Sequence, residues 1–202
     1  SFINAGQTCS CLKRLYVHDD DYDAVCEGLA NFVGGIKVGN GAEPDTLIGP
    51  LSNKMQFDKI VELVEDARAK GARILTGGET PNGKGYIYPL TIIADATDDM
   101  RVVAEEQFGP ILPVIRYSNL DDAIAKANGL EVGLGASTWG NDPEEAAKVA
   151  RKMVAGTRWV NRHGVLNPTV PMGGVKQSGI GVEFGEEGLR EYTTVQILSM
   201  AK

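Results

Sequence analysis

The sequence predicts an α/β fold of three layers, in which a mostly parallel sheet carries helices on both faces. Short apolar runs rich in β-branched residues alternate with amphipathic stretches of helical length along the chain. Strands that alternate with helices in this way are typical of parallel sheets. The 202 residues, 43% of them hydrophobic, are enough to bury a sizeable core.

Four stretches combine helical apolar spacing with a capping residue or a terminal glycine. They are residues 20–33 before Gly34, a stretch from an N-cap at Ser52 to Gly71, one that begins at Asn119, and one from Asp142 to Gly156. Five short apolar runs fit buried strands: residues 15–18, 73–76, 111–115, 134–139 and 157–161. Residues 194–200 alternate apolar and polar side chains and fit an edge strand in need of a partner.

Composition excludes several classes of function. The net charge is −7 and the pI is near 4.9, which argues against a nucleic-acid partner. No apolar run approaches the roughly 18 residues that a membrane span needs, so no membrane partner is expected. Three cysteines, an odd number, make a poor disulfide framework, and we expect a cytoplasmic protein. With no linker or repeat, residues 1–202 are interpreted as one domain.

The most unusual segment is residues 2–11, which contains Cys9. A tight turn after Gly6 would present this thiol, and the nearby Lys13 and Arg14 would favour its reactive thiolate form. The alternative is a small buried side chain, which is the interpretation for Cys11 and Cys26. No metal site is predicted, because two cysteines would need two further ligands and the two histidines lack ligand spacing.

Two other segments are candidates for binding. Glu105 and Glu106 precede Phe108, so the carboxylates could hold a sugar hydroxyl with the ring available for stacking; a solvated charge pair is the alternative. Residues 171–181 contain four glycines, and a ligand or another backbone could approach such a loop closely. As a dinucleotide fingerprint this loop is weak, because its glycine spacing is wrong and no buried strand precedes it.

Taken together and in this order, five segments resemble motifs of the aldehyde dehydrogenase superfamily, and the resemblance covers essentially the whole chain. The segments are residues 2–9, Glu106 to Pro110, Asn128 with Gly133 and Leu134, residues 156–161, and residues 171–181 with the glutamate, glycine and tyrosine that follow. Val132 and Met172 depart from the family pattern, which has an aromatic residue at both positions. Only the C-terminal catalytic domain of the family is matched.

The resemblance implies a role for each matched residue. Cys9 takes the position of the nucleophile, Glu106 that of the carboxylate that holds the nicotinamide ribose, and Phe108 that of the ring against the nicotinamide. Met172 lies where relatives line the substrate tunnel, and His163 is a second candidate for substrate contact, with a polar surface histidine as the alternative. The backbone N–H of Cys9 would donate to the developing oxyanion if Cys9 begins a helix, as in relatives.

The implied function is oxidation of an aldehyde to a carboxylic acid with NAD or NADP, through a thiohemiacetal and a thioester on the cysteine. In the family, an N-terminal half supplies the NAD-binding domain, the general base and an oxyanion-hole asparagine. That half is not part of this chain, so the cofactor site is expected to be incomplete and the isolated 202 residues inactive in hydride transfer. Relatives form dimers or tetramers, and residues 194–200 would supply the oligomerisation strand.

Two other hypotheses remain open. One is a folded domain without oxidoreductase activity, competent only for thiol acylation or for assembly. The other is a generic α/β binding module in which Cys9 is structural.

Overall fold

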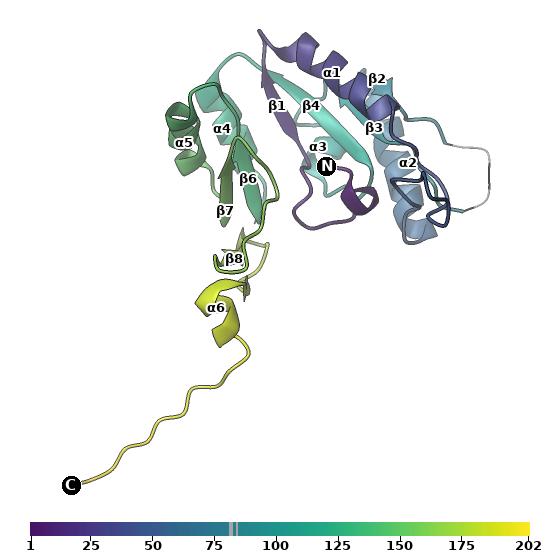
Figure 1. The fold of residues 1–202 in the computed structure, drawn as a ribbon. Helices are drawn as coiled ribbons and strands as arrows, with labels where there is room; N and C mark the ends of the chain where they lie inside the picture. The colour runs from purple at the N-terminus through teal and green to yellow at the C-terminus, as the bar shows by residue number, and fades with distance from the viewer. Residues whose placement is uncertain (81–82, 84) are drawn as a thin grey trace. The chain divides into compact units, whose positions relative to one another are not determined.

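The computed structural model describes residues 1–80, 83 and 85–202 (Figure 1). These residues form two compact units, Ser1–Lys126 and Ala127–Lys202. The division falls inside helix α4 (Leu120–Asn128), whose first turn is capped by the side chain of Asn119 as predicted. Because this boundary lies within a helix, no linker rich in Pro, Gly or Ser marks it, and the sequence could not indicate it.

The first unit is built on a four-stranded sheet in the order β1-β4-β3-β2. The strands are β1 (Leu15–His18), β2 (Arg73–Thr76), β3 (Thr91–Ala94) and β4 (Ile111–Tyr117). Strand β4 runs parallel to both β1 and β3, while β2 is antiparallel to β3. The sequence analysis missed β3, although all four of its residues are buried. A four-residue run without apolar–polar alternation carries little strand signal.

Helices cover both faces of this sheet, which confirms the predicted three layers. On β3, Ile92 belongs to the apolar core with α1 (Tyr22–Gly34), and its neighbour Ile93 belongs to the core with α2 (Lys54–Ala69). Successive side chains of a strand point to opposite faces, so the two helices lie on opposite sides. The predicted N-cap at Ser52 is wrong by one residue, because Asn53 caps α2 by accepting from the backbone N–H of Gln56.

The second unit contains a parallel pair of strands and two short antiparallel pairs. Strand β6 (Gly135–Thr138) is parallel to β7 (Thr157–Val160), and α5 (Pro143–Lys152) packs on both. Asp142 caps α5 with Pro143 at its first position, as predicted. The other pairs are β5 (Val132–Gly133) with β9 (Val175–Lys176), and β8 (Met172–Gly173) with β10 (Val182–Glu183).

Residues 194–200 form no strand in this chain. They follow helix α6 (Gly185–Arg190) as an extended segment whose side chains are exposed (Figure 1). An edge strand needs a neighbouring strand to complete its hydrogen bonds, and the single chain offers none to this segment. Its role in assembly therefore stays a prediction. Among the described residues, every helix is too short or too polar to cross a membrane.

Candidate active site

Cys9 lies on an exposed turn just before the sheet of the first unit. The backbone N–H of Cys11 donates to the carbonyl oxygen of Thr8 (3.0 Å) and closes the turn, and Cys9 is exposed at its tip. Cys9 does not begin a helix, so the condition under which its backbone N–H would donate to an oxyanion is not met in this structure. The prediction that Cys26 is buried is confirmed, whereas Cys11 is only partly buried.

The segment before Cys9 packs against the loop that follows Glu106, and two glycines allow the approach. A Cβ on Gly6 would lie 2.1 Å from the carbonyl oxygen of Gly109, and Gly6 has a positive φ of 73°. A Cβ on Gly109 would lie 2.3 Å from the Ile60 side chain on α2. The close approach of the two segments therefore requires glycine at position 6, and Gly109 lies directly against the Ile60 side chain of α2.

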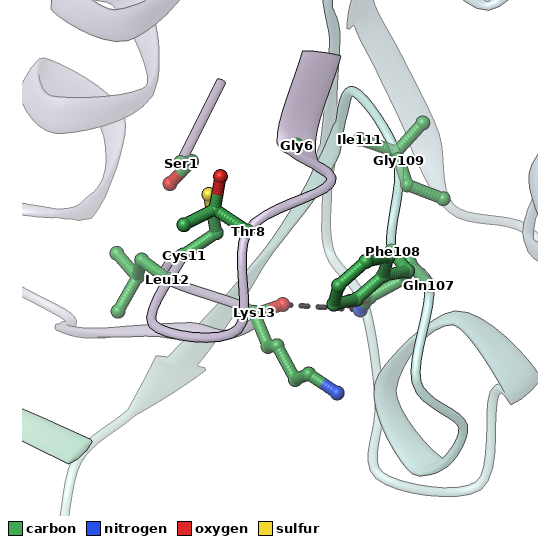
Figure 2. A pocket seen from close by; sticks show the side chains of 10 residues that line it. All are labelled: Ser1, Gly6, Thr8, Cys11, Leu12, Lys13, Gln107, Phe108, Gly109 and Ile111. Carbon is green, nitrogen blue, oxygen red and sulfur yellow. Dashed lines mark hydrogen bonds between the residues drawn. The ribbon is translucent and has the colours of Figure 1, made fainter. Parts of the chain in front are cut away.

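Gln107 joins the same two segments by hydrogen bonds. Its side-chain amide donates to the carbonyl oxygen of Lys13 (3.1 Å) and to that of Val102 in the short helix α3 (Arg101–Ala104). Figure 2 shows Gln107 facing Lys13 across the space between the two segments. Gln107 is only 2% exposed, so a polar side chain here is stable only with partners.

Two more glutamines hold these segments to α2 and to Ser52 just before it, and the sequence analysis missed all three glutamines. Gln7 accepts from the backbone N–H of Ser52 (3.0 Å) and donates to its hydroxyl (2.9 Å). Gln56 donates to the carbonyl oxygens of Gln107 (2.6 Å) and Phe108 (3.0 Å). Their partners are far away in the sequence, so no local pattern could have indicated them.

The adjacent carboxylates Glu105 and Glu106 point to different partners. Glu106 pairs with the ammonium of Lys13 (2.6 Å), and Glu105 pairs with the guanidinium of Arg101 (2.6 Å). The hydrogen bond from Arg101 holds the pKa of Glu105 below its ordinary value. The idea that the two carboxylates act together on one sugar hydroxyl is therefore wrong, and Glu106 alone stays available beside Phe108.

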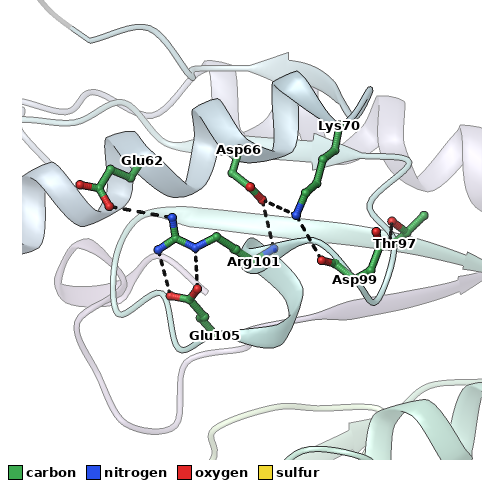
Figure 3. Close-up of polar contacts among 7 residues, drawn as sticks. All are labelled: Glu62, Asp66, Lys70, Thr97, Asp99, Arg101 and Glu105. Carbon is green, nitrogen blue, oxygen red and sulfur yellow. Dashed lines mark hydrogen bonds and ion pairs between the residues drawn. The ribbon is translucent and has the colours of Figure 1, made fainter.

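A charged network ties α3 and Glu105 to helix α2 (Figure 3). Asp66 accepts from the backbone N–H of Arg101 (3.2 Å) and pairs with Lys70 (3.2 Å). Lys70 also donates to the carbonyl oxygen of Asp99 (3.3 Å). The network fixes the start of α3, and Glu106 follows α3 after a single residue.

Lys13 and Arg14, which the sequence analysis expects to favour the thiolate form of Cys9, both contact other groups in the structure. Partial burial lowers the pKa of Lys13, and the hydrogen bond to Glu106 acts in the opposite direction. Arg14 donates to the Tyr16 hydroxyl (3.3 Å) and to the carbonyl oxygen of Lys126. The charge of Lys13 is thus shared with a carboxylate rather than directed at the thiol alone.

A small cavity lies between the two segments, lined among others by Thr8, Cys11, Lys13 and Phe108 (Figure 2). Its volume is about 10 Å³, close to the minimum that holds one water molecule. Phe108 is partly buried and has a positive φ of 51°. The cavity is too small for an aldehyde or a nicotinamide ring, and neither Cys9 nor Glu106 lines it.

Met172 and His163, the two candidate substrate contacts, both belong to the second unit. Met172 is a partly buried residue of β8. His163 is partly buried as well, with Nδ1 3.1 Å from the Ser137 hydroxyl and its ring edge-on to Trp159 at 5.1 Å. A packed, hydrogen-bonded ring differs from the freely exposed surface histidine that was the alternative.

Other residues of the matched motifs serve the framework of the second unit. Lys176 donates to the carbonyl oxygens of Asn128 (2.6 Å) and Leu130 (2.7 Å), at the end of α4. Asn128 accepts from the backbone N–H of Val154 (2.7 Å). A Cβ on Gly156 would lie 1.7 Å from the carbonyl oxygen of Gly173. These residues hold backbone segments together and present no reactive group.

The fold and this site define a class: an α/β protein that displays an exposed thiol on one of two packed segments and an exposed carboxylate with an aromatic ring on the other. Within the described residues, no group of three or more His, Cys, Asp or Glu side chains could hold a metal ion. The chain belongs to the aldehyde dehydrogenase family, whose model matches residues 1–198. This confirms the resemblance found in the motifs.

Several relatives show the extent of the similarity. The chain is 39% identical to an aldehyde dehydrogenase of Paenarthrobacter nicotinovorans, over 96% of this chain and 42% of the relative. It is 37% identical to succinate-semialdehyde dehydrogenase [NADP(+)] 1 of Mycobacterium bovis, over 98% of this chain and 43% of the relative. An NAD+ complex of an aldehyde dehydrogenase from Bacillus cereus superimposes with a TM-score of 0.89 at 38% identity, over 95% of this chain and 39% of that one. The chain thus spans about two fifths of the length of these relatives.

Proposed function

We propose that this chain is the catalytic half of an NAD(P)-dependent aldehyde dehydrogenase that oxidises an aldehyde to a carboxylic acid. The observation that carries the proposal is the packing of the segment just before the exposed Cys9 against the loop after Glu106, at Gly6 and Gly109, in a chain of this family. This packing supports a thiol and a ribose-binding carboxylate at one site.

Cys9 acts as the nucleophile. Its thiolate adds to the aldehyde carbonyl carbon, a carbon–sulfur bond forms, and the carbonyl oxygen becomes the oxyanion of a thiohemiacetal. When the oxyanion collapses, the hydrogen of the aldehyde carbon leaves as hydride and a thioester of Cys9 remains. Water then cleaves the thioester, which releases the carboxylic acid and returns the thiol. Covalent attachment divides one difficult oxidation into two easier steps.

Glu106 and Phe108 fit the nicotinamide half of the cofactor. A bound NAD or NADP supplies the acceptor for the hydride. The Glu106 carboxylate is 56% exposed and can accept from ribose hydroxyls, and the partly exposed Phe108 ring lies two residues away. The names of similar proteins mention both NAD+ and NADP(+), and we keep both cofactors in the proposal.

Met172 and His163 are proposed as substrate contacts. The thioether of Met172 suits an apolar part of an aldehyde. His163 presents a polar ring that is held through Nδ1 by the Ser137 hydroxyl. Assembly into a homodimer or homotetramer is part of the same proposal, with residues 194–200 as the strand that pairs between subunits.

The exposure of Cys9 favours a second function for the 202 residues taken alone. In this alternative the exposed Cys9 is acylated by reactive esters, or the chain serves in assembly, and no hydride is transferred. Both functions use the same displayed thiol, so the experiment must separate acylation from oxidation.

The test incubates the chain with an aldehyde and NAD+ or NADP+ and follows NADH or NADPH absorbance. A parallel reaction with p-nitrophenyl acetate measures acylation, which mass spectrometry assigns to a residue. We expect acylation of Cys9 without detectable cofactor reduction by the isolated chain. Cys9→Ala removes the acylation, whereas the buried Cys26→Ala retains it. Clear reduction would overturn the expected inactivity, and acylation of Cys26 at the rate of Cys9 would overturn the role of Cys9.

A further inference from the structure

The chain contains Asn–Gly pairs at residues 40–41, 82–83 and 128–129. In such a pair the backbone nitrogen of the glycine can attack the side-chain amide of the asparagine, because glycine has no Cβ to crowd the approach. The pair at 82–83 begins outside the described residues. The other two pairs differ in the contacts of the asparagine amide and of the backbone that follows it.

The Asn128 amide is held at both of its polar atoms. Its Nδ2 donates to the carbonyl oxygen of Lys152 (2.9 Å), and its Oδ1 accepts from the backbone N–H of Val154 (2.7 Å). The Lys176 ammonium donates to the backbone carbonyl oxygens of Asn128 (2.6 Å) and Leu130 (2.7 Å), one on each side of the glycine. Closing a ring between this amide and the next backbone nitrogen would break these contacts, so the fold protects the pair.

Asn40 lies in an exposed turn between α1 and α2, and its amide is held at one atom only. Its Oδ1 accepts from the backbone N–H of Ala42 (3.1 Å). Within the part of the chain that the structure describes, no hydrogen bond engages Nδ2 of Asn40 or the backbone N–H of Gly41. A Cβ on Gly41 would meet nothing within 4 Å, so the space around its nitrogen is open. The attacking nitrogen and the leaving nitrogen are both unengaged.

The oxygen that gains charge in the reaction has a donor in both pairs. Attack on the amide carbon places negative charge on Oδ1, and a fixed backbone N–H at that oxygen stabilises the charge. Ala42 supplies this donor to Asn40, and Val154 supplies it to Asn128. The pairs therefore differ in the hold on Nδ2 and on the backbone around the glycine, and both differences favour reaction at Asn40.

We propose that Asn40 is a site of spontaneous deamidation, which yields aspartate and isoaspartate, and that the fold protects Asn128 from the same reaction. The Gly41 nitrogen loses its proton to solvent and forms a bond to Cγ of Asn40, the Cγ–Nδ2 bond breaks, and Nδ2 leaves as ammonia. Water then opens the cyclic imide at either carbonyl. One product is aspartate, and the other is isoaspartate, whose main chain is longer by one methylene.

The products change the turn in two ways. Each adds a negative charge to a loop in which Lys37 already pairs with Glu43 and Asp45 (2.8 Å each). Isoaspartate also lengthens the main chain inside the turn that the Glu43 N–H closes on the carbonyl oxygen of Asn40 (3.0 Å). We therefore expect isoaspartate to loosen residues 37–48 more than aspartate does.

The test incubates the folded chain at mildly alkaline pH and follows each Asn–Gly pair by peptide mapping with mass spectrometry. We expect Asn40 to convert about tenfold faster than Asn128, the scale set by the additional hydrogen bonds of Asn128. The same chain in guanidinium chloride is the control, because the rates of the two pairs should converge once the fold is lost. Equal rates in the folded chain would overturn the proposal, and so would a difference that persists unchanged in the unfolded chain.

Two variants sharpen the test. Gly41→Ala crowds the attacking nitrogen and should slow conversion of Asn40 several-fold, and the open space around Gly41 accommodates the methyl group. Unchanged conversion in this variant would overturn attack by the Gly41 nitrogen. Asn40→Asp carries the charge of the product without the extra methylene, so hydrogen exchange of residues 37–48 should stay near wild type.

The incubated wild type gives the matching measurement for isoaspartate, which an isoaspartyl methyltransferase labels with a methyl group from S-adenosylmethionine. We expect the labelled fraction to exchange faster in residues 37–48 than Asn40→Asp does. Equal exchange would overturn the expected opening of the turn, and a chain without labelling at residue 40 would overturn isoaspartate as a product.

Discussion

The two units use the motifs of the aldehyde dehydrogenase family in different ways. In the first unit, the matched segments leave Cys9 and Glu106 exposed, and neighbouring side chains hold the loops around them. In the second unit, Lys176 and Asn128 are engaged with backbone groups, and Gly156 is in contact with another strand. A match to a family motif therefore indicates where a residue lies in the fold. Whether that residue is available for chemistry depends on its local contacts.

The units also differ in the kind of contact that holds the motif segments. Ion pairs surround the Glu106 loop, among them Lys13 with Glu106 and Arg101 with Glu105. The segments of the second unit approach backbone to backbone, as at Gly156 and Gly173. Ion pairs between partly exposed groups depend on pH and salt, whereas close backbone packing does not. The stability of variants in the two units should therefore differ in its dependence on pH and salt.

The largest effect is expected at Gly156. In Gly156→Ala the new Cβ would lie 1.7 Å from the carbonyl oxygen of Gly173, so strand β8 must shift. We expect a loss of about 3 kcal/mol or more in the free energy of unfolding of the second unit. Hydrogen exchange with mass spectrometry measures this unit separately from the first.

Gly181→Ala is the matched control, because a Cβ there meets nothing within 4 Å. It should leave the exchange rates of both units near wild type. Equal exchange in the two glycine variants would contradict a framework role for Gly156, and faster exchange in the first unit would contradict the separation of the units.

The sequence predicted most elements because their signals are local. Asn119 and the pair Asp142–Pro143 mark helix starts through their own side-chain and backbone chemistry. Strand β3 was missed because four buried residues have no alternation, and it occupies an internal place in the sheet. Strand β2 was itself predicted, but its antiparallel pairing could not be anticipated without β3.

The site was predictable only in part. Cys9 and Glu106 were identified by resemblance to family motifs, but the ion pair of Lys13 with Glu106 joins residues 93 positions apart. No periodicity or spacing records such a contact, because it forms only when β1 and β4 lie side by side. For the same reason, the contacts of the three glutamines that hold the loops could not be predicted from the sequence.

A moderate effect is expected at Gln107 in the first unit. Gln107→Met keeps the length of the side chain but removes both donors, so the carbonyl oxygens of Lys13 and Val102 lose their partner. We expect a loss of about 1–3 kcal/mol in the free energy of unfolding, the cost of unsatisfied buried polar groups. Faster hydrogen exchange in residues 8–14 would accompany it.

The control for this variant is Gln177→Met, at an exposed glutamine of the second unit. It changes the same atoms without removing a buried contact, so its stability should match wild type. If Gln107→Met is as stable as this control, the glutamine does not hold the two segments together.

The smallest effect is a pH dependence confined to the first unit. Arg73 donates to Asp95 (2.5 Å) and holds the pKa of that carboxyl below its ordinary value near 3.8. The ion pair therefore contributes stability at pH values above 3.8, and the contribution is lost as the pH falls through the lowered pKa of the folded state. Asp95 is substantially exposed and water screens the pair, so we expect less than about 1 kcal/mol.

Asp95→Asn tests this contribution, because asparagine tolerates the positive φ of 58° at this position. The difference between wild type and variant should be present near neutral pH and shrink below pH 4, in hydrogen exchange of the first unit only. A difference that persists unchanged in acid would show that Asp95 acts through its backbone conformation, and an equal response in the second unit would show that the two regions do not differ in their dependence on charge.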